Sequence, residues 1–241
     1  MWGFLSIGLV VLIFAHLNSV LVPHTEMTVL DFFSSFIVAM TTTYGSYGLY
    51  NQAAVYVRGK FKPHERFYFG ETWIDLALEF DATWVWVYSF AYYFVMVMCL
   101  VLSPSTTIFF RRVFQGLVTK LILVAIWRNC PPTTIPPQYI DLKETSKQVT
   151  SKSWSLMFLL AVQGVDGQSV NSIPSGHCAL MVVAISQLMS NLGLPICVIT
   201  HILLMVSCLK TKQHVFLDTV LGTMLGLGIS LGFIVLEGIL G

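Results

Sequence analysis

The sequence has few charged residues, and this scarcity excludes several classes of protein at once. Only 10% of its 241 residues are charged, while 56% are hydrophobic and the mean hydropathy is +0.76. A soluble core does not need this much apolar sequence, so the composition indicates a multi-span membrane protein. The net charge is +1, and no basic stripe with interleaved aromatic residues occurs. We therefore expect no nucleic-acid partner.

Cysteine is also scarce, and its pattern does not suggest a disulfide framework or a zinc site. The five cysteines form an odd set without a Cys-x-x-Cys spacing. Four of them lie in or beside apolar runs: Cys99, Cys178, Cys197 and Cys208. We interpret these four as small core residues, and they do not fix a redox compartment.

Long apolar runs dominate what remains, and a bilayer crossing needs roughly 20 such residues. We interpret as spans residues 2–22, 83–103, 107–127, 176–192, 194–209 and 215–240. Residues 27–50 form a less apolar run that carries Asp31, and length alone favours a further crossing. The first run lacks the basic start and cleavage site of a signal peptide, so we expect it to remain as a helix. The prediction is one all-α domain over residues 1–241, a bundle of six to seven transmembrane helices.

Three segments between the spans have other predicted roles. Residues 51–82 turn polar, and Glu71, Asp75 and Glu79 recur every fourth residue, which indicates an interfacial helix. This acidic stripe is typical of a solvated helix face, and the alternative is a divalent-metal site. The proline-rich residues 128–152 are predicted to form a lid or rim. Residues 153–162 are too short to span and are predicted to be re-entrant or interfacial.

Aromatic and small residues also mark particular spans. Trp84, Trp86 and Tyr88 suit the aromatic belt of a membrane interface. The last span carries two small-xxx-small patterns, residues 222–226 and 228–232, which predict close helix packing. His201 lies within an apolar span, and we interpret it as a core histidine.

Ionisable residues at the ends of spans are functional candidates, because such groups are costly in hydrocarbon without partners. His214 and Asp218 are four apart on one predicted helix, so the carboxylate can hold the imidazole. Ser175 and Gly176 stand just before an apolar run. A helix N-terminus offers free N–H groups to an anion there, and phosphate is the natural ligand.

The order of the spans brings these residues to one membrane face. Residues 176–192 and 194–209 are joined by Gly193 alone, and such a short turn makes them an antiparallel pair. Arg128, His177 and His214 are then predicted to lie at the same surface. Ten of the thirteen Lys and Arg residues flank that surface, so the positive-inside rule makes it cytoplasmic.

The motif residues resemble a known family. Pro174-Ser175-Gly176-His177, followed by Ser207, Lys212, His214 and Asp218, is similar to the second and third motifs of the type 2 phosphatidic acid phosphatase superfamily. The family's first motif is a lysine, six residues and Arg-Pro. Here seven residues separate Lys120 from Arg128, and Asn129-Cys130 precede Pro131. One extra residue turns Arg128 away from the expected face unless the helix ends first.

The resemblance implies a lipid phosphate phosphatase that works through a phosphohistidine, without metal or cofactor. It implies that His214 attacks the phosphorus, Asp218 orients it and His177 protonates the leaving oxygen. The residues that would hold phosphate oxygens are Lys120, Arg128, Ser175, Gly176, Ser207 and Lys212. The implied substrate is a lipid phosphate or phospholipid in the bilayer.

The sequence leaves alternatives for the reaction, the membrane side and the oligomeric state. Cys208 stands where many members carry arginine, and branches similar to inositol-phosphoryl and phosphocholine transferases often lack that arginine. A phosphotransferase that uses an alcohol acceptor such as a sphingolipid is therefore an alternative. A proton-coupled transporter that uses Lys120, Asp218 and the histidines is another. The family implies an extracytoplasmic or lumenal site, opposite to the charge rule, and the oligomeric state is unknown.

Overall fold

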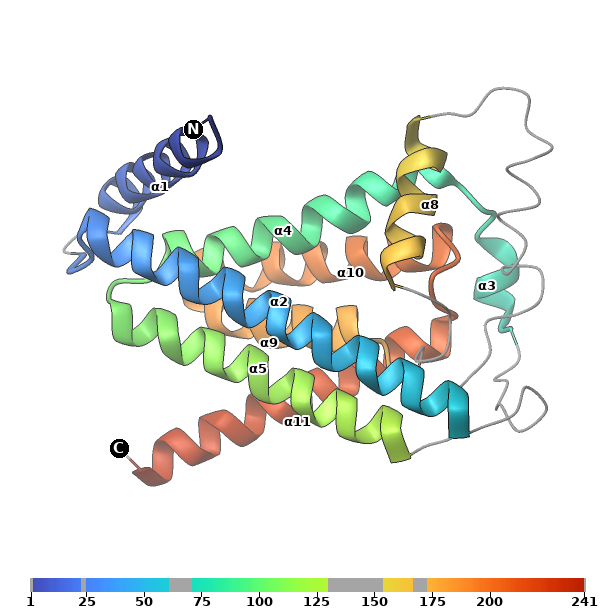
Figure 1. The fold of residues 1–241 in the computed structure, drawn as a ribbon. Helices are drawn as coiled ribbons and strands as arrows, with labels where there is room; N and C mark the ends of the chain where they lie inside the picture. The colour runs from blue at the N-terminus through green and yellow to red at the C-terminus, as the bar shows by residue number, and fades with distance from the viewer. Residues whose placement is uncertain (1, 23–24, 61–70, 130–153, 167–172, 241) are drawn as a thin grey trace.

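The chain folds into a bundle of α-helices, seen here in a computed structural model (Figure 1). The structure describes residues 2–22, 25–60, 71–129, 154–166 and 173–240. In chain order the elements are α1 (Trp2–Leu21), α2 (Val29–Lys60), α3 (Trp73–Ala77), the short 3-10 helix η2 (Ala82–Trp84), α4 (Val85–Val101), α5 (Thr106–Asn129), α8 (Trp154–Asp166), α9 (Gly176–Leu192), α10 (Leu194–Lys210) and α11 (Phe216–Leu240). No strand occurs within these ranges, so the predicted all-α class is confirmed.

Helix α9 is the centre of the bundle and packs against α4, α5, α10 and α11 (Figure 1). It is joined to α10 by Gly193, which has a φ of +79° and donates its N–H to the carbonyl of Met189. Glycine tolerates this left-handed conformation, and the reversal is completed in one residue. The two helices form the antiparallel pair that the sequence predicts.

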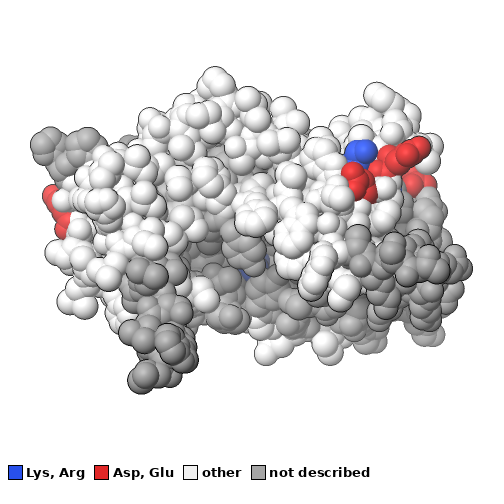
Figure 2. Space-filling view, turned by 90° about the horizontal axis from the view of Figure 1, so that it is seen from above, with Lys and Arg blue, Asp and Glu red and all other residues white. Residues whose placement is uncertain are grey.

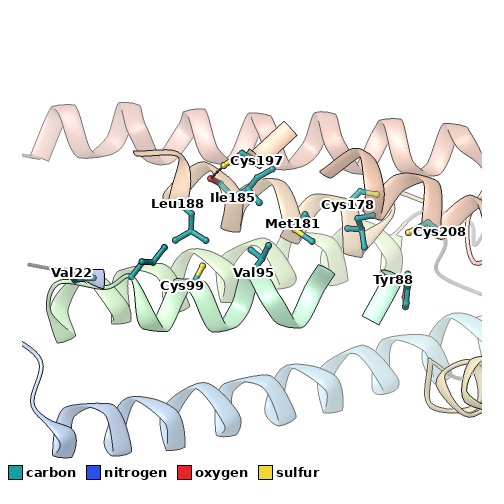
Figure 3. Packing of buried hydrophobic residues seen from close by; sticks show 12 residues of the cluster. Val22, Tyr88, Val95, Cys99, Cys178, Met181, Ile185, Leu188, Cys197 and Cys208 are labelled. Carbon is teal, nitrogen blue, oxygen red and sulfur yellow. Dashed lines mark hydrogen bonds between the residues drawn. The ribbon is translucent and has the colours of Figure 1, made fainter. Parts of the chain in front are cut away.

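The main core lies between α4, α9 and α10 (Figure 3). Val95, Met181, Leu188 and Leu204 are fully buried there. The cysteines at 99, 178, 197 and 208 are buried free thiols, as predicted from their apolar surroundings. The predicted core histidine, His201, is 8% exposed, and its Nε2 lies 2.9 Å from the hydroxyl of Thr223.

Helices α9 and α11 approach each other closely through one of the two predicted glycine pairs. A Cβ at Gly222 would collide with the Ser175 carbonyl oxygen, and one at Gly226 would lie 2.6 Å from the Ala179 oxygen. The prediction is wrong for Gly228 and Gly232, which have no such neighbour within 4 Å. That half of α11 has an exposed apolar surface instead.

The segment between the second and third predicted spans differs from the expectation. Helix α2 is 32 residues long and continues through residues 51–60. Several of these are good helix formers despite their polarity. The predicted long interfacial helix is only the five-residue α3, and Asp75 on it is 2% exposed. The interpretation of a solvated acidic face is therefore wrong for Asp75, although Glu79 is exposed.

The chain before the Pro-Ser-Gly-His motif agrees with two further expectations about helix length. Helix α5 ends at Asn129, just before Pro131, as the proline predicts. Helix α8 has 13 residues and is too short to cross a bilayer, in agreement with the sequence. The predicted lid at residues 128–152 lies outside the described residues from position 130 on, and so do Asn171 and Ser172.

Within the described ranges, one helix segment is long and apolar enough to cross a membrane by itself, Phe216–Ile239. On the face shown in Figure 2, most of the visible charged side chains lie near the two ends. Many large apolar side chains are exposed on the bundle, among them Val20, Leu30, Phe90, Ile202 and Ile234.

Candidate active site

The N-terminus of α9 is fixed by the Pro-Ser-Gly-His motif. Ser175 caps the helix: its Oγ accepts the N–H of Cys178 at 3.4 Å, and its own N–H donates to the carbonyl of Asp218 at 3.0 Å. A Cβ at Gly176 would lie 3.1 Å from the Trp127 ring, so glycine allows α5 to approach closely. The first turn of α9 is thereby held against both α5 and α11.

The turn between α10 and α11 is a Schellman motif with lysine where glycine is usual. The N–H of Lys212 donates to the carbonyl of Leu209 (3.1 Å), and that of Gln213 to Cys208 (3.0 Å). Lys212 has a φ of +54°, in the left-handed region. This conformation costs a side-chain-bearing residue roughly 1–2 kcal/mol. Other contacts of Lys212 must offset that cost.

Those contacts come from residues 72–81, which we call the strap. The Lys212 Nζ donates to the carbonyl oxygens of Asp75 (2.9 Å) and Leu78 (2.7 Å). The Asp81 N–H donates to the Lys210 carbonyl at 3.0 Å. The strap therefore grips the turn from residue 210 to residue 212 through three hydrogen bonds.

The strap also caps α11 from outside. The Phe216 N–H, the first of α11, donates to Asp75 Oδ1 at 2.7 Å. The other oxygen, Oδ2, accepts the backbone N–H and the hydroxyl of Thr72, which completes a capping box on α3. A carboxylate near a helix N-terminus is favoured by the helix dipole. One buried acid thus organises two helix starts.

Asp218 joins the start of α11 to the imidazole of His214. Its Oδ2 accepts the N–H of Val215 at 3.3 Å and lies 3.5 Å from His214 Nδ1. His214 is 8% exposed and Asp218 2%. The two side chains lie in ion-pair contact, as predicted, but not on one helix: His214 lies in the turn before α11, and only Asp218 belongs to the helix. A proton on Nδ1 would face the carboxylate, so the lone pair of Nε2 points elsewhere.

The second histidine lies beside the first. The ring centroids of His177 and His214 are 6.0 Å apart. The hydroxyl of Tyr88, on α4, is 2.7 Å from His177 Nε2 and 3.1 Å from Nδ1. Tyr88 is 4% exposed, so this hydroxyl has little access to water. It holds the ring of His177 in place next to His214.

The remaining predicted phosphate ligands differ in where they lie relative to the two histidines. Lys120 is close enough to His177 for their charges to interact. Ser207 is fully buried, and its hydroxyl donates to the Leu204 carbonyl at 2.7 Å. Arg128 is exposed at the end of α5, where its guanidinium lies 4.8 Å from the centre of the Tyr56 ring. The extra residue in the first motif has this consequence: Trp127, rather than Arg128, faces Gly176.

Burial changes the pKa of Lys212, the basic residue that the strap holds. It lowers the pKa of the Lys212 ammonium below its usual value, and the carboxylates of Asp75 and Glu71 oppose that shift. The pKa of Asp81, by contrast, is held below its ordinary value chiefly by the hydroxyl of Thr83 and then by its backbone N–H. The strap thus brings carboxylate charge to a lysine beside the candidate site.

Sequence reasoning missed two residues of this arrangement, Tyr88 and Asp75. Tyr88 belongs to an aromatic cluster that suits a membrane interface, and its contact with His177 spans 89 positions. Asp75 bonds Phe216 across 141 positions. The Thr72-x-x-Asp75 capping spacing was the one local signal that this acid had a structural role.

Residues 61–232 match the model of the PAP2 superfamily, so the chain belongs to that superfamily of phosphatases and phosphotransferases. The matched range includes every residue of the site described above. Searches of curated proteins and of solved structures gave no match. The family supports a phosphoric-ester hydrolase or transferase activity in general.

Proposed function

We propose that the protein is a multi-pass membrane lipid phosphate phosphatase that works through a phosphohistidine. The observation that carries this proposal is the pair of imidazoles, 6.0 Å apart between ring centroids, with a buried carboxylate against one of them. Phosphoryl transfer to an enzyme side chain requires a nucleophile, an acid that orients it and a second group that carries a proton.

The two histidines take different roles because their partners differ. The Nε2 atom of His214 attacks the phosphorus while Asp218 stabilises the charge that develops on the ring. The bond from phosphorus to the lipid oxygen breaks, and His177 gives that oxygen a proton. Water then attacks the phosphorus and gives a proton to His177, the bond between phosphorus and His214 Nε2 breaks, and phosphate leaves with both histidines restored.

Positive charge for the phosphate oxygens comes from Lys120, Lys212 and the N-terminus of α9 at Ser175 and Gly176 in this proposal. Ser207 and Arg128 serve as further ligands in the family-based expectation. Each would have to leave its present partner, the Leu204 carbonyl or the Tyr56 ring, to reach a phosphate.

The exposed apolar surface supports a membrane location for the bundle. Large apolar side chains cover the outer faces of α1, α2, α10 and α11, and a soluble monomer rarely exposes such continuous patches. In lipid the same side chains are well solvated. We therefore assign α1, α2, α4, α5, α9, α10 and α11 as seven crossings, with the histidines at one end.

A phosphotransferase is the second candidate, and Cys208 favours it. This thiol, fully buried in the core, follows Ser207 where many relatives carry arginine. Purified protein in vesicles should release inorganic phosphate from labelled phosphatidic acid or polyprenyl phosphate. Label that appears only in a new lipid, and only when ceramide or another alcohol is added, would replace hydrolysis by transfer.

A further inference from the structure

A cavity of about 290 Å³ lies inside the bundle, between α1, α2, α4, α5 and α9. Its walls are apolar except for five residues: Thr42, Cys99, Arg112, Lys120 and Gln187. Figure 2 shows a hollow near the middle of one face with a basic side chain at its bottom. Apolar walls with a few polar groups are typical of small-molecule sites.

The cavity begins next to the candidate active site. Its wall on α9 is the stripe Leu180, Val183, Ala184 and Gln187. Leu180 is three residues after His177, so the stripe continues the helix face that carries the histidine. On α5 the wall includes Lys120, one turn before Leu123, which packs against Ala179 close to His177 on α9. An anion at the histidines would therefore lie at the mouth of an apolar channel.

The channel is about as long as one leaflet of a bilayer is thick. On α9 the path from His177 to Gln187, whose carbonyl binds Arg112, is ten residues, which is roughly 15 Å along a helix. The hydrocarbon core of a bilayer is roughly 30 Å thick, so one leaflet contributes about half of that. A lipid chain whose headgroup sits at the histidines matches this length.

The far end of the channel is closed by a fixed group. Arg112 donates from Nη1 to the Cys99 carbonyl (2.9 Å) and the Ser103 hydroxyl (3.0 Å), and from Nη2 to the Gln187 carbonyl (3.3 Å). These bonds tie the ends of α4 and α9 to α5. A guanidinium held in this way does not yield easily to a longer chain.

We propose that this cavity binds one hydrocarbon chain of the substrate and that Gly116 sets the length it accepts. The inference rests on the proposed phosphatase function. The volume is at the lower end of ligand pockets, roughly 300 Å³, which suits one chain and not two. Lys120 at the mouth and Arg112 at the floor leave an apolar stretch between two cations, with Gly116 at its middle.

Gly116 is a suitable place to shorten the channel. It lines the cavity, and a Cβ added there would meet no heavy atom within 4 Å. Gly116→Leu should therefore fill part of the channel without displacing a neighbouring helix. Gly228 on α11 is a matched control, because it also has no neighbour within 4 Å and lies outside the cavity.

The test uses the purified full chain in vesicles and a series of monoalkyl phosphates of increasing length. For the wild type, kcat/KM should rise by up to about fourfold per buried methylene and level off once the chain reaches Arg112. Gly116→Leu should level off at a shorter chain and lose about tenfold for long chains relative to short ones. Gly228→Leu should follow the wild type.

A binding measurement separates this inference from the proposed function. A long alkyl phosphate with a photoreactive group at its end should label the wild type on α5 or α9 near Arg112, and Gly116→Leu should lose that labelling. Labelling without any turnover would refute the phosphatase assignment and keep the chain site. Three results would overturn the chain site. The first is a kcat/KM that shows no plateau with chain length, and the second is an equal loss at all chain lengths in Gly116→Leu. The third is labelling on the outer surface alone.

Discussion

At the scale of single residues, the site depends on what each imidazole touches. His214 faces a carboxylate, and His177 faces a phenol hydroxyl at 2.7 Å. A carboxylate orients the ring beside it and stabilises the positive charge that develops there, which suits a nucleophile, whereas a neutral hydroxyl offers no such charge and suits a group that gives a proton away. The assignment of roles rests on this difference.

Tyr88→Phe tests the role of the Tyr88 hydroxyl, which is the neutral partner of His177. A hydrogen bond of this kind contributes about 1 kcal/mol, so we expect kcat for a lipid phosphate to fall by roughly fivefold with little change in KM. A nitrophenyl phosphate needs less help from an acid and should be affected less. Tyr56→Phe, at an exposed tyrosine on α2, is the matched control and should behave as the wild type. Equal losses on both substrates would show that Tyr88 does not act through His177.

The positive side chains near the site also predict that activity needs no metal ion. In the proposed mechanism the positive charge for the phosphate oxygens comes from Lys120, Lys212 and the N-terminus of α9, so turnover should persist in excess EDTA. The measurement is phosphate release before and after chelation, and then with added Mg²⁺. Activity lost on chelation and restored by Mg²⁺ would contradict the account.

At the scale of elements, the site depends on two junctions, that of α9 with α11 and that of the strap with the turn. The first is tight because Gly222 allows the backbone of Ser175 to lie against α11. The second is formed by the hydrogen bonds of Asp75 and Lys212. Both junctions fix where the two histidines and Asp218 lie.

Gly222→Ala tests the first junction. The added methyl collides with the Ser175 carbonyl oxygen, so we expect a loss of roughly 1–3 kcal/mol in the free energy of unfolding and a displaced site. Gly228→Ala adds the same group where no atom lies within 4 Å and should be neutral or slightly stabilising. Thermal unfolding and kcat of both variants decide the matter. Equal effects would mean that the close approach is not required.

Asp75→Ala tests the second junction. It leaves the N–H of Phe216 without its acceptor, which costs roughly 1–3 kcal/mol when the donor is buried. Because His214 and Asp218 flank Phe216, we also expect kcat to fall by about tenfold or more while KM changes little. Glu79→Ala removes an exposed acid from the same strap and serves as control. A drop in stability with unchanged kcat would limit Asp75 to a purely structural role.

At the scale of the whole molecule, hydrophobic runs predicted the helices, and their order predicted that the two histidines lie at one end of the bundle. A single-residue turn at Gly193 forces α9 and α10 to be antiparallel, so His177 and His214 had to meet at one end. Contacts between segments far apart in the chain could not be predicted in this way, because no local sequence pattern marks them. The Asp75–Phe216 bond and the placement of Tyr88 depend on how whole helices pack. The polar end of α2 was missed because helix propensity, and not hydropathy, continues it.

Whether His214 becomes covalently phosphorylated tests the central claim most directly. Purified wild type, given labelled lipid phosphate and quenched rapidly, should carry an acid-labile, alkali-stable adduct, as a phosphoramidate does. His214→Ala should lose both the adduct and turnover. Asp218→Asn should keep slow labelling although turnover falls by several orders of magnitude. His177→Ala should still form the adduct from nitrophenyl phosphate, because a good leaving group needs no acid. Labelling that survives in His214→Ala but disappears in His177→Ala would contradict the assignment of the nucleophile.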